Sequence, residues 1–230
     1  MKKLLLAAVA LVSLATATNA RAASILYARA FVNNVQVGVT DTGSGTAPLV
    51  SVFNGGGFTL ISTATGIPLI ESPGFGGQTT EIQSSGAAGS ARIEISQTGI
   101  DRATATDGTL AKLISSFSAT LLNGLTKITS VTLTTYAAAS NLQFDMSTLL
   151  ASITYLPGGG SSQSTSDLVG NVNLTNPLFS ETIVITAVVT GDATVQGNAQ
   201  IVGVPEPASL ALLGSALLGL GLARRTRRQA

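Results

Sequence analysis

The stretch from residue 181 to residue 204, ETIVITAVVTGDATVQGNAQIVGV, decides the fold class of this chain. It is rich in β-branched residues, and in parts of it apolar and polar residues alternate with a period of two. The dipeptide Gly191-Asp192 interrupts this pattern, and such a pair is typical of a turn. The stretch therefore predicts two strands joined by a turn.

The same pattern recurs toward the N-terminus, in residues 25–40, 91–99 and 127–136. In the second of these segments Ile93 and Ile95 fall on one face, which leaves Glu94 on a face that we expect to be solvated. Gly-rich clusters such as DTGSG, NGGG, SPGFGG and LPGGGSSQSTSD separate the segments and predict turns. Many short strands between such turns predict an all-β body, a β-sandwich or a jelly-roll-like fold.

Two stretches could each form either a helix or a strand. Residues 109–124 place Leu110, Leu113, Ile114 and Phe117 at helical spacing, but their abundant Ser and Thr also suit a strand. Residues 144–156, FDMSTLLASITYL, are equally ambiguous.

Composition excludes several classes of function. The chain of 230 residues has no Cys and no His, so a disulfide framework, a thiolate or His-ligated metal site and a Ser-His-Asp triad cannot be built. Between residues 23 and 203 there are five basic and ten acidic residues, which gives this part a net charge of −5. An acidic body without a basic stripe makes nucleic acid an improbable partner.

The N-terminus has the layout of a secretory signal peptide. A cationic start, MKK, precedes an apolar stretch from Leu4 to Ala17 and then small residues. Cleavage is plausible after Ala20 or Ala22, and we favour Ala22, so we expect residues 1–22 to be removed by signal peptidase after transport by the general secretion machinery.

The C-terminus, residues 204–230, reads VPEPASLALLGSALLGLGLARRTRRQA. Residues 208–223 carry no charge and would span about 24 Å as a helix, which predicts a thin transmembrane helix in the inner membrane. The basic cluster that follows should stay cytoplasmic and set the orientation; it comprises Arg224, Arg225, Arg227 and Arg228. Pro205 and Pro207 hold Glu206 in an extended peptide beside this anchor, which is a form that a processing enzyme can bind.

Together, Pro205-Glu206-Pro207, the apolar run and the arginines resemble the PEP-CTERM sorting signal of Gram-negative bacteria. The resemblance covers about the last 27 residues and says nothing about the body. It implies that an exosortase, a membrane-embedded cysteine protease-transpeptidase, processes the protein near the motif. It also implies a host that makes exopolysaccharide and a membrane-anchored precursor that ends at the cell surface or in the extracellular matrix.

Candidate chemistry in the body is sparse. Asp41-Thr42-Gly43 matches the tripeptide of aspartic proteases, but those enzymes need two such aspartates and the second is missing, so a turn is the better interpretation. A pair of carboxylates for glycoside hydrolysis would have to come from Glu81, Glu94 and Glu181, and no spacing singles one out. We therefore assign no catalytic residue, no metal site and no cofactor.

The sequence thus predicts three parts: a signal peptide (1–22), a secreted acidic all-β domain (23–203) and a sorting signal (204–230). We expect a non-enzymatic protein, structural or adhesive in a biofilm matrix in association with exopolysaccharide. One alternative is a polysaccharide-binding module, although the absence of Trp and the three Tyr argue against an aromatic platform for sugar rings. The other alternative is a secreted carbohydrate hydrolase that works through carboxylates.

Overall fold

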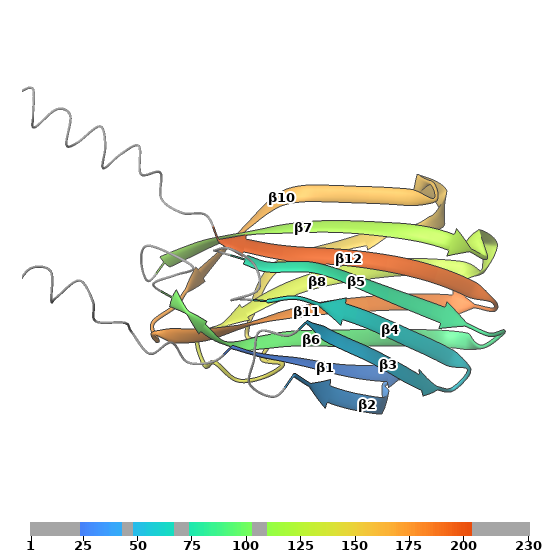
Figure 1. The fold of residues 1–230 in the computed structure, drawn as a ribbon. Coiled ribbons are helices and arrows are strands. Elements are labelled where there is room, and N and C mark those ends of the chain that lie inside the picture. Colours follow the sequence, from blue (N-terminus) through green and yellow to red (C-terminus); the bar gives the residue numbers. More distant parts are fainter. Residues whose placement is uncertain (1–23, 43–47, 67–73, 103–109, 204–230) are drawn as a thin grey trace, which may run out of the picture.

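The computed structural model describes residues 24–42, 48–66, 74–102 and 110–203. In this part the chain is all-β and forms two antiparallel six-stranded sheets that pack face to face (Figure 1). The prediction of an all-β sandwich is confirmed.

The strands of each sheet are named in their spatial order, so that neighbours are hydrogen-bonded to each other. The first, sheet A, consists of β2 (Val35–Asp41), β1 (Ile25–Val32), β6 (Ala88–Asp101), β11 (Leu178–Thr190), β8 (Ile128–Ala138) and β9 (Thr148–Tyr155). The second, sheet B, consists of β10 (Ser162–Asn173), β7 (Leu110–Asn123), β12 (Ala193–Gly203), β5 (Gly74–Ser84), β4 (Phe58–Ala64) and β3 (Leu49–Gly55). Two short 3₁₀ turns, Leu125–Lys127 and Pro157–Gly159, connect strands of opposite sheets.

The last eight strands form a ribbon that is folded back on itself. Strand β8 pairs with β9, β7 with β10, β6 with β11 and β5 with β12, so the second half of this ribbon retraces the first. Rolling such a ribbon into two sheets gives the strand orders β5-β12-β7-β10 and β6-β11-β8-β9, which are those of a jelly roll. Strands β1–β4 extend this unit, two in each sheet, at its β5 and β6 side.

Alternating apolar residues fill the space between the sheets. In β12 every second side chain from Ala193 to Gly203 is buried, and the intervening ones face outward. In β6 and β11 the inward residues Ile93, Ile95, Ile183 and Ile185 are fully buried. Their alternation matches the period of a strand with one covered face, so the hydrophobic effect fixes which face of each strand is inside.

Both ambiguous stretches are strands. In β7 the buried residues are Leu113, Phe117 and Leu121, with Ser115 and Ala119 buried between them, which is a period of two. The helical spacing is incidental, because Ile114 lies on the outer face, opposite Val169 of β10. The second stretch begins as a loop and becomes strand β9 only at Thr148.

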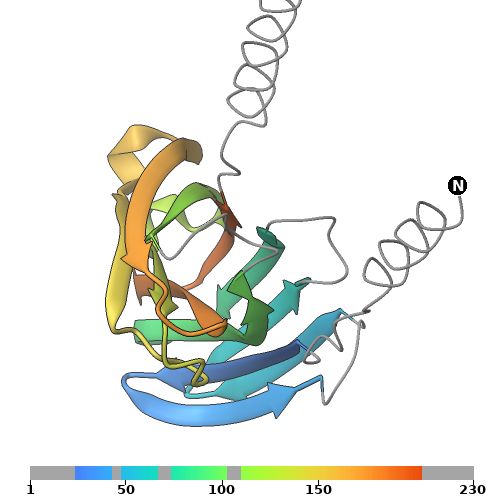
Figure 2. The ribbon, with the colours of Figure 1, turned by 90° about the vertical axis from the view of Figure 1, so that its left-hand side faces the viewer.

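The two ends of the sandwich differ. Tight turns gather at one end, including Asn33-Asn34 between β1 and β2 and Gly56-Gly57 between β3 and β4, all four with positive φ as two-residue hairpins of this kind require. Strand β1 begins and β12 ends at the opposite end, on the left in Figure 1 and toward the viewer in Figure 2. The longer connections, such as residues 139–147, lie at this opposite end.

Candidate functional site

Three strands of sheet B carry polar residues at every second position. The segments are QGNAQ (196–200) in β12, SFSAT (116–120) in β7 and SQSTS (162–166), which begins β10. In β7 and β12 the small and aromatic residues of these segments face the core, because Phe117, Ala119 and Ala199 are all buried. The amides and hydroxyls between them must therefore point outward.

The pairing of the strands brings these outward side chains into rows. Gln196 lies opposite Thr120, and Thr120 lies opposite Ser162. In the next row Asn198 lies opposite Ser118, which lies opposite Ser164, and Gln200 lies opposite Ser116 in a third. We call this set the amide–hydroxyl array; it consists of Gln196, Asn198, Gln200, Ser116, Ser118, Thr120, Ser162 and Ser164.

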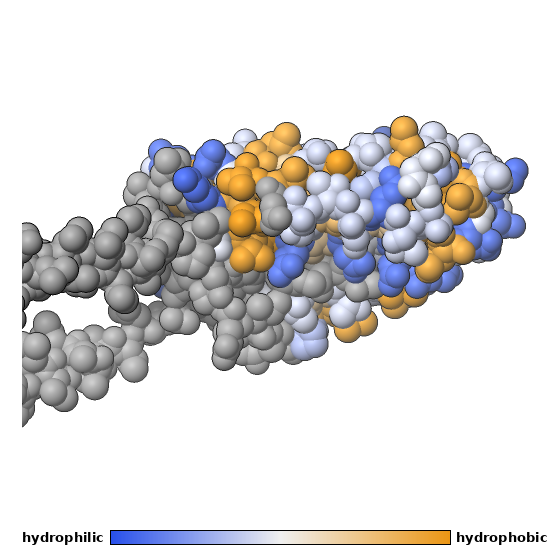
Figure 3. All heavy atoms as spheres, turned by 90° about the horizontal axis from the view of Figure 1, so that it is seen from above, coloured by the Kyte–Doolittle hydropathy of each residue, from blue (hydrophilic) through white to orange (hydrophobic). Residues whose placement is uncertain are grey.

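A groove of about 300 Å³ lies over the middle of the array. Its walls include the polar residues Ser118 and Asn198 and the segment 164–166, and also the apolar residues Phe117 and Ala199. The last of these lies where the register of β10 against β7 shifts, between Thr165 and Leu168. Seen from above, the surface over β10 and β7 is mostly pale or blue, with separate apolar patches (Figure 3).

The chemistry of the array is that of neutral hydrogen bonding. Hydroxyls and amides both donate and accept, and neighbouring rows lie about 7 Å apart along a strand. Within the array, Asn198 Nδ2 donates to Ser118 Oγ at 3.3 Å. None of its eight side chains carries a charge. Such a surface can exchange its bonds to water for bonds to a ligand rich in hydroxyl groups, but it offers no activated nucleophile.

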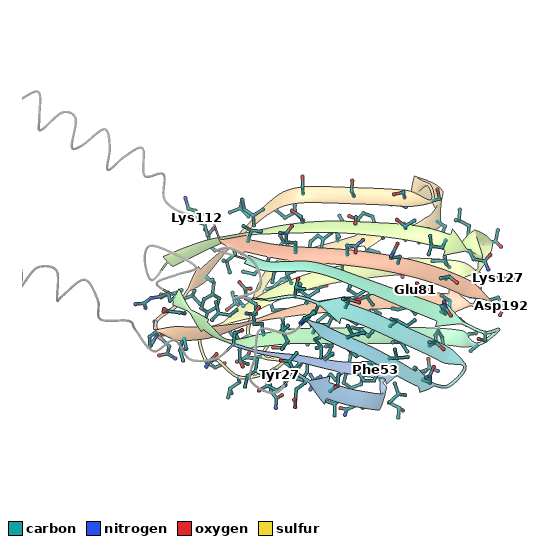
Figure 4. All side chains as sticks on the ribbon, in the orientation of Figure 1. Tyr27, Phe53, Glu81, Lys112, Lys127 and Asp192 are labelled. Carbon is teal, nitrogen blue, oxygen red and sulfur yellow. The ribbon has the colours of Figure 1, made fainter. Side chains whose placement is uncertain are left out.

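The three glutamates considered for hydrolysis lie on three different faces. Glu81 faces outward on sheet B, where it lies opposite Gln196 and accepts a hydrogen bond from Gln83 (Figure 4). Glu94 faces outward on sheet A, between Arg29 and Val184, and Glu181 faces the interior. A glycosidase needs two carboxyl groups on either side of one bond, so no two of these three can act as that pair.

Glu94 does not lie on a solvated face, so that expectation is wrong. The residue is only 2% exposed, because Arg29 and Arg92 cover it. Arg29 Nε lies 2.5 Å from one carboxylate oxygen, and Arg92 Nε lies 2.9 Å from the other. The arginines are themselves about one-third exposed, which leaves an ion cluster with its anion inside and its cations at the surface.

Aromatic rings hold these arginines in place. The guanidinium carbon of Arg29 lies 4.1 Å from the ring centre of Phe144 and 5.4 Å from that of Phe31, and Arg92 lies over Phe31 at 4.3 Å. Tyr27 meets Phe144 edge to face at 6.2 Å. Sequence reasoning missed this cluster, because Phe144 comes from the loop before β9, more than 100 residues after Phe31.

Glu181 lies in the interior near the end of the sandwich where β12 ends. It is 4% exposed, and two and four residues further along the same inward face lie Ile183 and Ile185. Its cross-strand neighbour Gln97 is fully buried and donates to Ser24 Oγ at 2.5 Å. Burial raises the pKa of the Glu181 carboxyl to about 8, since the low-dielectric interior disfavours the charged form.

The remaining predicted sites can be placed only in part. The sorting motif Pro205, Glu206 and Pro207, the apolar run 208–223 and the arginine cluster lie outside the described residues, as does the signal peptide. Asp41 is the last residue of β2. Within the described ranges, no helix is long and apolar enough to cross a membrane, and no three acidic side chains cluster as metal ligands would.

The two described lysines lie at opposite ends of the sandwich, Lys112 at the end where β12 finishes and Lys127 among the tight turns (Figure 4). The two lysines therefore form no common basic patch.

Comparison with known proteins identifies the tail. Residues 203–228 match the family described as the PEP-CTERM protein-sorting motif, so the suspected resemblance is confirmed and indicates an exported protein. No curated protein matches the chain.

Among solved structures, the chain is similar to TmCBM61 in complex with β-1,4-galactotriose, with 11% identity, 70% of this chain and 90% of that chain covered, and a TM-score of 0.34. It is also similar to the CBM22-1 xylan-binding domain of Xyn10C from Paenibacillus barcinonensis, with 12% identity, 71% and 90% coverage, and the same TM-score. A third is the PA14 sugar-binding domain from an RTX adhesin, with 10% identity, 79% and 91% coverage, and a TM-score of 0.32. TM-scores this low establish neither a shared fold nor a shared ligand.

Proposed function

We propose that this protein is an exported, exosortase-processed surface or matrix protein whose β-sandwich binds a neutral polysaccharide through the amide–hydroxyl array. The observation that carries the proposal is the alignment of Gln196, Asn198 and Gln200 with hydroxyl side chains of two neighbouring strands. The binding would serve adhesion within the matrix and would not require catalysis.

Charge supports a neutral ligand over an anionic one. The part of the chain between residues 23 and 203 has a net charge of −5, and Glu81 lies beside the array. The negative charge of the protein would repel an anionic polysaccharide bound along sheet B, whereas it would not repel a neutral one. The arginines that would suit an anion, Arg29 and Arg92, are already paired with Glu94 on the opposite sheet.

The alternative of a carbohydrate hydrolase receives no support from the geometry. Glu81, Glu94 and Glu181 point away from one another, and none of the three lines the groove. We therefore assign the groove a binding role.

The test compares the full-length protein with a variant that lacks two central side chains of the array, Ser118→Ala with Asn198→Ala. Each lost hydrogen bond contributes about 0.5–1.5 kcal/mol, so the loss of two should lower the affinity for the host's polysaccharide roughly five- to 150-fold. The matched control, Thr59→Ala with Gln83→Ala, removes a hydroxyl–amide pair from β4 and β5 on the same face and should bind within about twofold of the unchanged protein. Equal affinity for all three proteins in titration calorimetry would contradict the assignment.

A further inference from the structure

The outer face of sheet B changes from polar to apolar near the end of β12. In the row that follows Gln200 and Ser116, Val202 lies opposite Ile114, and Ile114 lies opposite Val169 of β10. Val169 is 55% exposed, and the other two apolar side chains are partly exposed. An apolar row across three strands therefore borders the amide–hydroxyl array at the end of the sandwich where β12 finishes.

This apolar row continues around the edge of the sandwich onto sheet A. A Cβ added to Gly170 would lie 2.8 Å from the Cα of Leu150, so β10 and β9 touch at this level. Leu149, which precedes Leu150 in β9, is 56% exposed. Single exposed apolar residues are normal, whereas adjoining ones form a surface that a partner can cover. We call this set the apolar patch; it consists of Val202, Ile114, Val169 and Leu149.

The course of the chain selects a membrane as the partner of this patch. Strand β12 ends at Gly203, directly after Val202, and the predicted transmembrane run begins at Ala208. The five chain steps between Gly203 and Ala208 span at most about 18 Å even when they are fully extended. In the membrane-anchored precursor of the proposed function, the patch is therefore held within reach of the lipid surface.

The residues beside the patch suit the headgroup layer of a bilayer. Lys112, at the end where β12 finishes (Figure 4), lies opposite Asn171 in the next row, and both are exposed. An ammonium group next to apolar side chains can contact lipid phosphates while those side chains enter the interface. The net charge of −5 between residues 23 and 203 provides no long-range attraction to an anionic membrane. The contact therefore depends on the high local concentration that attachment through the tail provides.

We propose that the apolar patch rests on the outer surface of the inner membrane while the precursor is anchored there. The contact would bury Val169 and Leu149 in the headgroup layer and hold the end of β12 close to the lipid. The sorting motif 205–207 would then lie at the membrane surface, where a membrane-embedded processing enzyme can bind it. The proposal rests on the sorting part of the proposed function and does not depend on sugar binding.

The first test separates contact through the patch from mere attachment through the tail. Since the chain has no Cys, Asn171→Cys provides one thiol for a fluorescent label, and Val35→Cys provides a matched label among the tight turns. The full-length proteins are placed in phosphatidylethanolamine–phosphatidylglycerol vesicles with a headgroup quencher, with and without a flexible spacer of about twenty Gly and Ser residues after Gly203. We expect the label at residue 171 to keep most of its quenching when the spacer is present, and the label at residue 35 to show little in either form. Quenching at residue 171 that falls to the level at residue 35 would overturn the proposal.

The second test identifies the patch as the cause of the quenching. In the spacer-bearing protein labelled at residue 171, Val169→Asp places a charge in the patch and should reduce the quenching to that of the label at residue 35. Val35→Asp is the matched control and should have no effect, since Val35 is also an exposed valine but lies at the opposite end. Equal effects of the two substitutions would contradict the patch. Protein that does not float with the vesicles would refute the membrane anchor and the contact with it, whereas vesicle-bound protein with an unquenched label would refute the contact alone.

Discussion

Glu94 illustrates how far a single residue can be predicted from its own segment. The alternation of residues 91–99 assigns it correctly to the face opposite Ile93 and Ile95. Its burial, however, depends on Arg29 from a neighbouring strand and on Phe144 from a distant loop. Local periodicity determines the direction of a side chain, whereas only the tertiary fold determines what covers it.

Glu181 carries the clearest prediction at this scale. Its pKa is raised from an ordinary 4.5 to about 8 by burial, so between these values the folded protein holds a proton that the unfolded chain has lost. The stability that this proton provides is complete below pH 4.5, and it is lost as pH rises toward 8, by roughly 1.4 kcal/mol per pH unit. Glu181→Gln cannot ionise and should remove this decline.

Thermal unfolding between pH 4 and pH 8 measures the effect. We expect Glu181→Gln to have a higher melting temperature than the unchanged protein near pH 8 and a similar one near pH 4. Glu81→Gln, the same change on the outer face of sheet B, should leave the pH dependence as it is. Parallel curves for Glu181→Gln and the unchanged protein would show that the carboxyl ionises in the folded state as freely as in water.

At the scale of elements, the sequence predicts a strand correctly where apolar residues alternate with polar ones, so that one face of the strand is apolar. The stretch 181–204 is indeed two strands, β11 and β12, with a turn at Gly191-Asp192. Residues 109–124 remained ambiguous because leucines occur on both faces of β7, including the 53% exposed Leu122. The polar periods of QGNAQ, SFSAT and SQSTS are also visible in the sequence. Their alignment is not, since it requires the pairing of strands about 80 residues apart.

Gly170 in β10 tests how closely the edges of the two sheets approach each other. A Cβ at this position would lie 2.8 Å from the Cα of Leu150, a backbone atom of β9 that cannot move without shifting the strand. We expect Gly170→Ala to lower the free energy of unfolding by about 1–3 kcal/mol through overpacking. In Gly158→Ala the added methyl group meets open space, and its effect should stay within about 0.5 kcal/mol. Urea denaturation that ranks the two variants alike would contradict this packing.

At the scale of the whole molecule, the sequence predicts where the protein is sent better than it predicts what the protein does there. The tail is a linear signal, and its order of motif, apolar run and arginines was identified from the sequence and matches a known family at residues 203–228. The function that we propose for the body depends on a surface that exists only after folding. Its function class could therefore be narrowed by composition, but the array could not be located before the strand order was known.

Replacement of Pro205, Glu206 and Pro207 by alanines tests the sorting proposal. Export across the inner membrane should continue, because the predicted signal peptide, the apolar run 208–223 and the arginines are unchanged. The final processing step should fail and leave a membrane-held precursor, which is detected by its size and location in a host with the matching exosortase. Shortening the arginine cluster alone should instead weaken orientation or retention. If the triple-alanine variant still loses its tail, the three residues are not recognised by the processing enzyme and serve only as a linker.

The central claim, that the amide–hydroxyl array binds neutral polysaccharide, is tested most directly by a crystal structure of the protein with an oligosaccharide of the host's matrix. The account predicts a sugar across β12, β7 and β10, with its hydroxyl groups within hydrogen-bond distance of Asn198 and Ser118. A sugar bound on sheet A instead, against Arg29 and Phe144, would contradict it.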